Sequence, residues 1–473
     1  MTGIQCVRIE KDSLGEVRVP GTSIPFIGSY LGRNFDLTCY ALNPVNIPCA
    51  APSIAHSVKI YSALAVDLLS SEHSNQRRKF AVLQRLSLAF LLAWVALAPA
   101  TSGAQQGKIK IAVQAPLSGE QAALGEHIKL GAQLAVEEAV KAFKALGYDL
   151  VLVPQDDQAK PEIGVANARN MVADPEVLVI VGHFNSGVAL PASEVYKDAM
   201  LAMISPANTA TEITDRGYPN VNRVCGRDDV QGPVGARFAA QELKVKSVYI
   251  IHDKTLYGQG VADNFRNEAK KLGINILGYD GTEERANFSP MINPLKAKNP
   301  ALVYFGGIYH QGGLLLKQLR EKGVTAKFMG PDGLDSAEMV KIAGASAVGS
   351  YYTSVAGPPD AYPETAAFAK KFKQRFGKDV EAFGLYGYDA TLVGIKAMEG
   401  WLKAHPGKKP TRTEVSTAVR KLKGFKGVTG PIEFDNKGDP VKAKYFVLQF
   451  EKQAYPGKVV KVIEQQAPDA KKS

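Results

Sequence analysis

The chain has 473 residues, of which 45% are hydrophobic and 22% are charged. This length allows about three domains with substantial cores, and the composition excludes a peptide hormone, a fibre and a wholly disordered chain. The net charge of +11 is not gathered into a long basic run, so nucleic-acid binding is not expected.

The first 80 residues differ from the rest of the chain, because prolines interrupt them and no helical or strand periodicity is evident. We predict that residues 1–80 are an extension that is either disordered or not translated, with the true start near Val82 or Leu83. The alternative is a genuine extension in front of a signal anchor. After residue 50 the only cysteine is Cys225, which excludes an intradomain disulfide or a cysteine-based zinc site there.

A secretory signal peptide is predicted over residues 81–104. The apolar run 86–100 follows basic residues and is followed by small residues up to Ala104. The run is shorter than the roughly 20 residues that a spanning helix needs, and it suits cleavage after Ala104. No cysteine follows at Gln105, so a lipid anchor is not expected and the mature protein should be free in the periplasm.

From residue 108 onward, apolar β-rich runs alternate with helical patterns, which is typical of parallel α/β sheets. The first series of strands is expected at 109–114, 150–154, 177–181 and 201–205, with a helix over 127–146. The second series is expected at 248–251, 274–279, 302–305 and 327–329. Helices over 362–376, 390–403 and 413–423 precede short strands at 432–434, 445–450 and 458–463. The pattern predicts two doubly wound lobes, with chain crossings near 225–226, 353–356 and 435–438.

Ligands of open parallel sheets bind beyond the carboxyl ends of the strands, so the residues after each strand are informative. These turns are small and mostly uncharged, and they open onto helix N-termini that suit a carboxylate. We predict that Ser186 and Thr209 hold a carboxylate and that Asp332 holds an ammonium group. The alternatives are that Ser186 and Thr209 are helix caps and that Asp332 only forms a turn.

The chain resembles the leucine/isoleucine/valine-binding protein family, the periplasmic receptors of branched-chain amino acid ABC importers. Eight collinear segments within residues 107–452 carry the resemblance: IKIAVQAPLSG, VGHFNSGVALPAS, AMISPANTATEITDRGY, DDVQGPVGA, IIHDKTLYGQG, LVYFGG, KFMGPDG and TGPIEFDNKGD. It implies the type I periplasmic binding protein fold, an α/β fold of two parallel-sheet lobes joined by a multi-strand hinge. The N-terminal lobe is then expected to comprise 105–225 plus 355–435, and the C-terminal lobe 226–354 plus 436–473.

The resemblance also implies a ligand site. The amino-acid end of the ligand would be held by Ser186, the Ala207 backbone, Thr209, Tyr257 and Asp332, and the side-chain pocket would be lined by Leu124, Ile308 and Phe383. Leu124 and Ile308 are aliphatic at positions where the family has aromatic residues. The positions of the family's first-lobe disulfide hold Ala159 and Asn185. Tyr257 and Phe383 could instead be core aromatics.

The resemblance therefore implies that the protein is the binding component of an ABC importer. It would bind a branched-chain or other apolar amino acid, trap this ligand by hinge closure and deliver it to a membrane permease. It would be a monomer without a cofactor, a metal or catalytic residues. A metal or general-base site at His183, His252 and His310 is not expected, because His183 and His252 fall in different predicted lobes. The alternatives are a receptor for an aromatic or aliphatic carboxylate or amide, a sensory receptor domain and a periplasmic enzyme. The common nucleophile, phosphate-binding and zinc-protease motifs of enzymes are missing.

Overall fold

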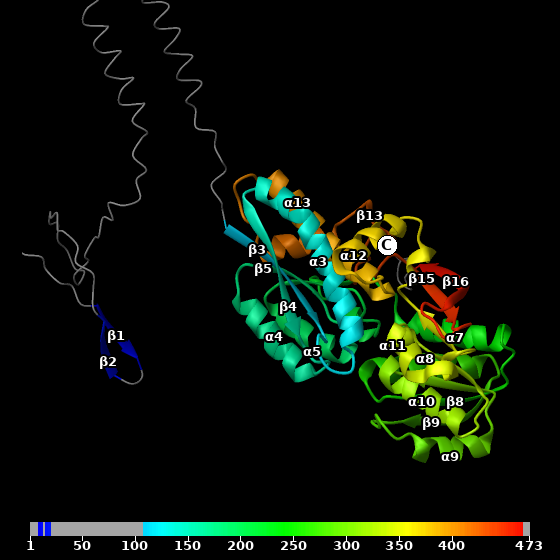
Figure 1. Ribbon diagram of the computed structural model, residues 1–473. Coiled ribbons are helices and arrows are strands. Elements are labelled where there is room, and N and C mark those ends of the chain that lie inside the picture. The colour runs from blue at the N-terminus through cyan, green and yellow to red at the C-terminus, as the bar shows by residue number, and fades with distance from the viewer. Residues whose placement is uncertain (1–7, 13–14, 20–106, 467–473) are drawn as a thin grey trace, which may run out of the picture. The chain divides into compact units, whose positions relative to one another are not determined.

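The computed structural model describes residues 8–12, 15–19 and 107–466 (Figure 1). The chain divides into two compact units, Met1–Ala100 and Thr101–Ser473. In the first unit β1 (Arg8–Asp12) and β2 (Gly15–Val19) form an antiparallel pair, which the sequence patterns did not predict. The predicted signal peptide and most of the extension lie outside the described residues.

The first sheet of the second unit has five strands in the order β4-β3-β5-β6-β7, all paired in parallel. Its strands are β3 (Gly107–Ala115), β4 (Tyr148–Asp156), β5 (Val177–Gly182), β6 (Ala202–Ser205) and β7 (Val221–Arg223). Four of them were expected from their apolar runs. The fifth, β7, is only three residues long and was missed.

Helices cover both faces of this sheet. They are α3 (Ala122–Ala145), α4 (Pro161–Ala173), α5 (Ser186–Asp198), α6 (Glu212–Asp215), α12 (Thr365–Phe376), α13 (Ala382–Ala404) and α14 (Arg412–Arg420). Along β3, Ala112 is buried in a cluster with residues of α4 and α5, whereas Ile111 and Val113 are buried in a cluster with residues of α3 and α13. A strand buried on both faces reads as a continuous apolar run, which is the pattern seen in the sequence.

Helices α3 and α13 come from distant parts of the sequence and lie side by side (Figure 1). They approach so closely that a Cβ added to Gly131 would lie 2.1 Å from the Gly384 carbonyl oxygen. A helical pattern was expected only from residue 390, but α13 begins at Ala382. The helix expected over 362–376 begins at Thr365.

The second sheet has seven strands in the order β16-β15-β12-β11-β10-β8-β9. They are β8 (Ser247–His252), β9 (Asn275–Gly281), β10 (Leu302–Gly306), β11 (Lys327–Gly330), β12 (Tyr351–Ser354), β15 (Lys442–Gln449) and β16 (Lys458–Gln466). Strands β8 to β12 are parallel, and the β15–β16 hairpin adds two antiparallel strands beside β12. The predicted fold class of two mostly parallel α/β lobes is therefore confirmed.

The helices of this lobe are α7 (Asp228–Gln241), α8 (Leu256–Lys271), α9 (Ser289–Lys298), α10 (Tyr309–Glu321) and α11 (Ala337–Ala343). Short 3-10 turns occupy Asp332–Leu334, Gly344–Ala347 and Pro359–Ala361. A small hairpin joins β13 (Phe425–Gly427) to β14 (Gly430–Ile432). The strand expected at 432–434 was wrong in extent, because Phe434 forms only an isolated bridge with Pro440.

The chain passes between the two sheets three times: after β7, after β12 and before β15. A buried ion-pair network joins the first and third passages. The Asp439 carboxylate accepts hydrogen bonds from Arg223 Nε at 2.6 Å, Arg227 Nη1 at 2.7 Å and Thr214 Oγ1 at 2.8 Å. The Arg223 side chain is fully buried, so this network fixes the connecting segments where the lobes meet.

In the described part of the chain, no helix has both the length and the apolar character that crossing a membrane requires.

Candidate ligand-binding site

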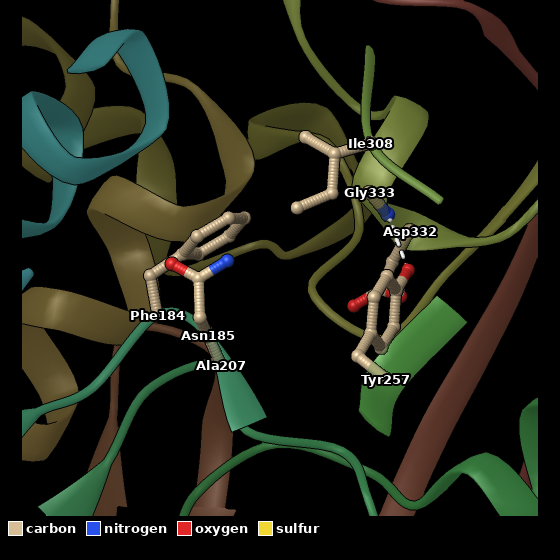
Figure 2. A pocket seen from close by; sticks show the side chains of 7 residues that line it. All are labelled: Phe184, Asn185, Ala207, Tyr257, Ile308, Asp332 and Gly333. Atoms are coloured by element: carbon tan, nitrogen blue, oxygen red, sulfur yellow. Dashed lines mark hydrogen bonds between the residues drawn. The ribbon is translucent and has the colours of Figure 1, made fainter. Parts of the chain in front are cut away.

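A pocket is lined by residues of both lobes (Figure 2). Phe184, Asn185 and Ala207 come from the loops after β5 and β6 of the first lobe. Tyr257, Ile308, Asp332 and Gly333 come from the segments after β8, β10 and β11 of the second lobe. The pocket therefore lies at the carboxyl ends of the strands of both sheets, where open α/β sheets bind their ligands.

The second lobe contributes a buried tyrosine and carboxylate pair. Tyr257 lies in the first turn of α8, whose N-cap residue Thr255 accepts a hydrogen bond from the Gly258 N–H. Tyr257 Oη donates to Asp332 Oδ1 at 2.6 Å and accepts from the Gly333 N–H at 2.7 Å. Burial raises the pKa of Asp332 to about 6. This arrangement is suited to a carboxylate that pairs with a positively charged group of a ligand.

A second buried carboxylate, Asp228, lies close to the first. Burial raises the pKa of Asp228 well above its usual value, and the negative charge of Asp332 raises that pKa further. The Thr209 side chain faces Asp228 and lowers its pKa, yet neither carboxylate oxygen of Asp228 accepts a hydrogen bond of good geometry. The Gln231 amide faces Asp332 and lowers its pKa, yet neither polar atom of Gln231 forms a hydrogen bond of good geometry. Because buried polar groups in native proteins are normally satisfied, this cluster is suited to a bound cation.

The first lobe contributes hydroxyl groups and a helix N-terminus. Ser186 is the first residue of α5 and is buried, and its Oγ accepts a hydrogen bond from the Ala210 N–H at 3.4 Å. Thr209 is fully buried, and its Oγ1 faces the Asp228 carboxylate without forming a hydrogen bond of good geometry. The Ala207 N–H donates to Ser205 Oγ, so its carbonyl is the backbone group left for a ligand.

Asn208 holds the two loops of the first lobe in place. Its Oδ1 accepts from the His183 N–H at 3.0 Å, and its Nδ2 donates to the Phe184 carbonyl at 2.9 Å. Its own N–H donates to Ser205 Oγ at 2.8 Å. The Asn208 side chain thus ties the loop after β5 to the loop after β6.

The remaining pocket wall is apolar. Ile308 and Phe184 line the pocket, and the Phe383 ring packs edge-on behind Phe184 with 5.5 Å between the ring centroids. Phe383 is almost fully buried, so it supports Phe184 instead of lining the wall itself. Leu124 is fully buried in α3 and is not among the residues that line the pocket.

The two lobes are in contact at a second place, through Glu120 in the loop before α3. Arg285 forms an ion pair with the Glu120 carboxylate at 2.6 Å, and His310 Nδ1 lies 3.3 Å from the same carboxylate. Tyr309 Oη donates to the Glu120 carbonyl at 2.7 Å. These contacts describe a form of the protein in which the lobes touch.

The strand-end histidines lie in separate surroundings. His183 is fully buried between Asp157, 3.0 Å from its Nδ1, and Tyr196, 3.2 Å from its Nε2. His252 packs against Tyr279. In the part of the chain that is described, no group of three or more His, Cys, Asp or Glu side chains is arranged to hold a metal ion.

Comparison with known proteins places this architecture in a family. The family model described as periplasmic binding protein matches residues 108–454. The chain belongs to the periplasmic binding protein family. A Leu/Ile/Val-binding protein homologue of Brucella abortus is 37% identical to it over 355 residues, which cover 75% of this chain and 93% of the relative.

Two further proteins support the assignment to the periplasmic binding proteins. A leucine-, isoleucine-, valine-, threonine- and alanine-binding protein of Pseudomonas aeruginosa is 35% identical over 350 residues, covering 73% of this chain and 91% of the relative. The crystal structure of a leucine-binding protein from Thermotoga maritima superposes with a TM-score of 0.69 at 27% identity. That match covers 76% of this chain and 99% of the other. The resemblance inferred from the sequence motifs is therefore confirmed.

In this periplasmic binding protein the predicted site residues divide into two groups. Ala207, Tyr257, Ile308 and Asp332 line the pocket, whereas Ser186, Thr209, Phe383 and Leu124 do not. Their roles toward a ligand stay a prediction.

The residues Phe184, Asn185, Gly333 and Asp228 lie at the site but were not among the predicted site residues. Phe184 and Asn185 stand directly after a predicted strand, so their position was the signal that could have found them. Asp228 follows β7, the short strand that the apolar pattern did not reveal.

Proposed function

We propose that this protein is the substrate-binding component of an ABC importer that binds a branched-chain or other apolar amino acid between its lobes and delivers it to a permease. The observation that carries the proposal is the buried carboxylate of Asp332, which lines a pocket together with apolar Ile308 and Phe184 and has a second buried carboxylate, Asp228, close by. Buried charges are normally paired, and the α-ammonium group of an amino acid supplies the missing positive charge.

The opposite end of the ligand is assigned to the first lobe. The N-terminus of α5 at Ser186 and the hydroxyl of Thr209, which forms no hydrogen bond of good geometry in the structure, are suited to the α-carboxylate, because helix N-termini and hydroxyl donors stabilise anions. The Ala207 carbonyl can accept from the ammonium group. A ligand held in this way contacts both lobes and thereby favours the form in which they touch.

The apolar wall of Ile308 and Phe184 is suited to an aliphatic side chain. The names of the relatives support this choice, since they refer to leucine, isoleucine and valine. The relatives are binding proteins, and the proposal accordingly assigns no catalytic residue and no enzymatic activity to this chain.

We also propose that residues 81–104 act as a cleaved signal peptide and that the mature protein works as a monomer in the periplasm. The sequence pattern and the family support the periplasmic location. Protein recovered from the periplasm is expected to begin at or very near Gln105. N-terminal sequencing that finds a residue before Arg77 on the secreted form would contradict both the signal peptide and the proposed start site.

The ligand class is tested by a thermal-shift panel on the mature protein. A ligand at about 100 times its dissociation constant should stabilise the protein by roughly 2.7 kcal/mol, which is easily measured. Leucine, isoleucine, valine or phenylalanine should stabilise the protein. The leucine analogue 4-methylpentanoate, which lacks only the ammonium group, should not. Stabilisation by 4-methylpentanoate or benzoate but by no amino acid would instead support a carboxylate receptor.

The affinity for leucine is expected to fall as the pH drops below about 6. The pKa of Asp332 is raised to about 6 in the empty site, and a ligand ammonium group lowers that pKa again. Ligand binding therefore releases a proton at acid pH, and the affinity falls by up to about tenfold per pH unit. Calorimetry between about pH 7 and about pH 5 measures this slope. An affinity that rises toward acid pH would argue against a charged Asp332 in the complex.

A further inference from the structure

Arg223 contacts the candidate site as well as the buried network between the lobes. Its side chain is fully buried at the end of β7, and its Nε donates to Asp439. Its Nη1 donates to two carbonyl groups of the loop after β6, that of Asn208 at 2.7 Å and that of Ala210 at 2.9 Å. These two residues flank Thr209, the residue proposed to bind the ligand carboxylate. One guanidinium group therefore joins this loop to the segment that connects the lobes before β15.

The bonds to these carbonyl groups determine how the loop presents its main chain. In a trans peptide unit the carbonyl group and the N–H of the following residue point in opposite directions. Because the Asn208 carbonyl is bound to Arg223, the Thr209 N–H points away from the guanidinium group. The next peptide unit is held as well, since the Thr209 carbonyl accepts from the Asp228 N–H at 2.9 Å. The direction of the Thr209 N–H is thus fixed by residues on the first passage between the lobes.

An arginine is suited to this arrangement. Its planar guanidinium group carries several N–H donors in a fixed geometry, so one side chain can bind two carbonyl groups and a carboxylate at the same time. The Asn208 side chain also holds the loop, but it bonds to His183 and Phe184 of the loop after β5. The carbonyl groups on either side of Thr209 are bound by Arg223 instead.

We propose that Arg223 is a positioning residue, which orients Thr209 toward the carboxylate of the bound ligand by holding the carbonyl groups of Asn208 and Ala210. Arg223 does not line the pocket, so it acts through Thr209 and not by contact with the ligand. Because the same guanidinium group binds Asp439, the orientation of the loop depends on the segment before β15. This inference rests on the proposed function, since it needs a ligand with a carboxylate on the first lobe.

The test compares leucine with leucinamide, which keeps the ammonium group and the side chain but lacks the carboxylate charge. Dissociation constants for both ligands are measured by calorimetry on the mature protein and on R223K, with competition against leucine where leucinamide binds weakly. The lysine keeps the positive charge beside Asp439 but cannot reproduce the planar fork. The ratio of the leucinamide constant to the leucine constant is expected to fall by roughly 10-fold or more in R223K, because a hydrogen bond to the charged carboxylate is lost. A purely structural defect would weaken both ligands equally and leave this ratio unchanged.

T214V is the matched control. The Thr214 hydroxyl bonds to Asp439, Arg223 and Arg227, which lie outside the loop after β6, so its removal disturbs the same network and leaves both carbonyl bonds of Arg223 in place. The ratio is expected to stay unchanged in T214V. If R223K folds poorly, the double variant R223M/D439L should show the same fall in the ratio, because replacing a buried ion pair by apolar side chains of similar size often preserves stability. Ligand-free thermal unfolding of each variant is the folding control.

The two proposals fail in different ways. If leucine binds the unmodified chain and the ratio is the same in R223K and R223M/D439L, the role of Arg223 is wrong and the proposed function still stands. An equal fall of the ratio in T214V would also overturn this role, because the carbonyl bonds would then not be its cause. If leucine and the other apolar amino acids all fail to bind the unmodified chain, the proposed function is wrong and the role of Arg223 is overturned with it.

Discussion

Replacing Asp332 by Asn is expected to weaken binding of the amino acid by about 30-fold to several thousandfold, which corresponds to a loss of about 2 to 5 kcal/mol. The substitution keeps the shape of the side chain and its hydrogen bond to Tyr257 Oη, but it removes the charge that faces the ammonium group. Asp332 is fully buried against Tyr257 and Gly333, so water cannot substitute for that charge.

Calorimetry on the mature protein measures the loss. Glu338→Gln is a matched control, because Glu338 lies nearby in α11 and forms only a partly exposed ion pair with Lys341. The control is expected to leave the affinity unchanged, since ion pairs of this kind contribute little. An Asp332→Asn protein with unaltered affinity would remove this residue from the site.

The second large effect is expected at the buried network between the lobes. Replacing Asp439 by Asn should lower the free energy of unfolding by about 3 to 5 kcal/mol, because Arg223 and Arg227 then keep their charges without the carboxylate. The exposed fraction of the Arg223 side chain is 0%, so neither water nor an anion from solution can replace the lost carboxylate. The two arginines hold the pKa of Asp439 below its usual value although burial acts in the opposite direction.

Urea denaturation measures this change in stability. Asp215→Asn is the matched control, because Asp215 pairs with the same Arg227 but its side chain is 42% exposed. Its loss is expected to cost less than about 1 kcal/mol. Equal costs for the two substitutions would show that burial of Asp439 does not determine the strength of the network.

The sequence predicted the regular part of the fold well, because strands buried on both faces are apolar throughout. The runs at β5 and β10 have every residue buried, and each was expected within one or two residues. The predictions failed where elements were short or depended on distant partners. Strand β7 has three residues, and the start of α13 is stabilised by packing on α3, which no local pattern reveals.

Part of the candidate site could also be predicted from the sequence. Asp332 could be found because it follows a predicted strand, and Tyr257 could be found through the family resemblance. The structure joins the two by a hydrogen bond although they are 75 positions apart in the sequence. Asp228 could not be found from the local pattern, since its closeness to Asp332 depends on how α7 packs in the second lobe.

The most direct test of the proposed ligand class is mass spectrometry of the small molecule that is released from natively expressed, mature protein. We expect a free α-amino acid with an aliphatic or other apolar side chain, which carries both an ammonium group and a carboxylate. Release of a carboxylic acid without an amino group, such as an aromatic acid, would contradict the pairing of Asp332 and Asp228 with a ligand ammonium group.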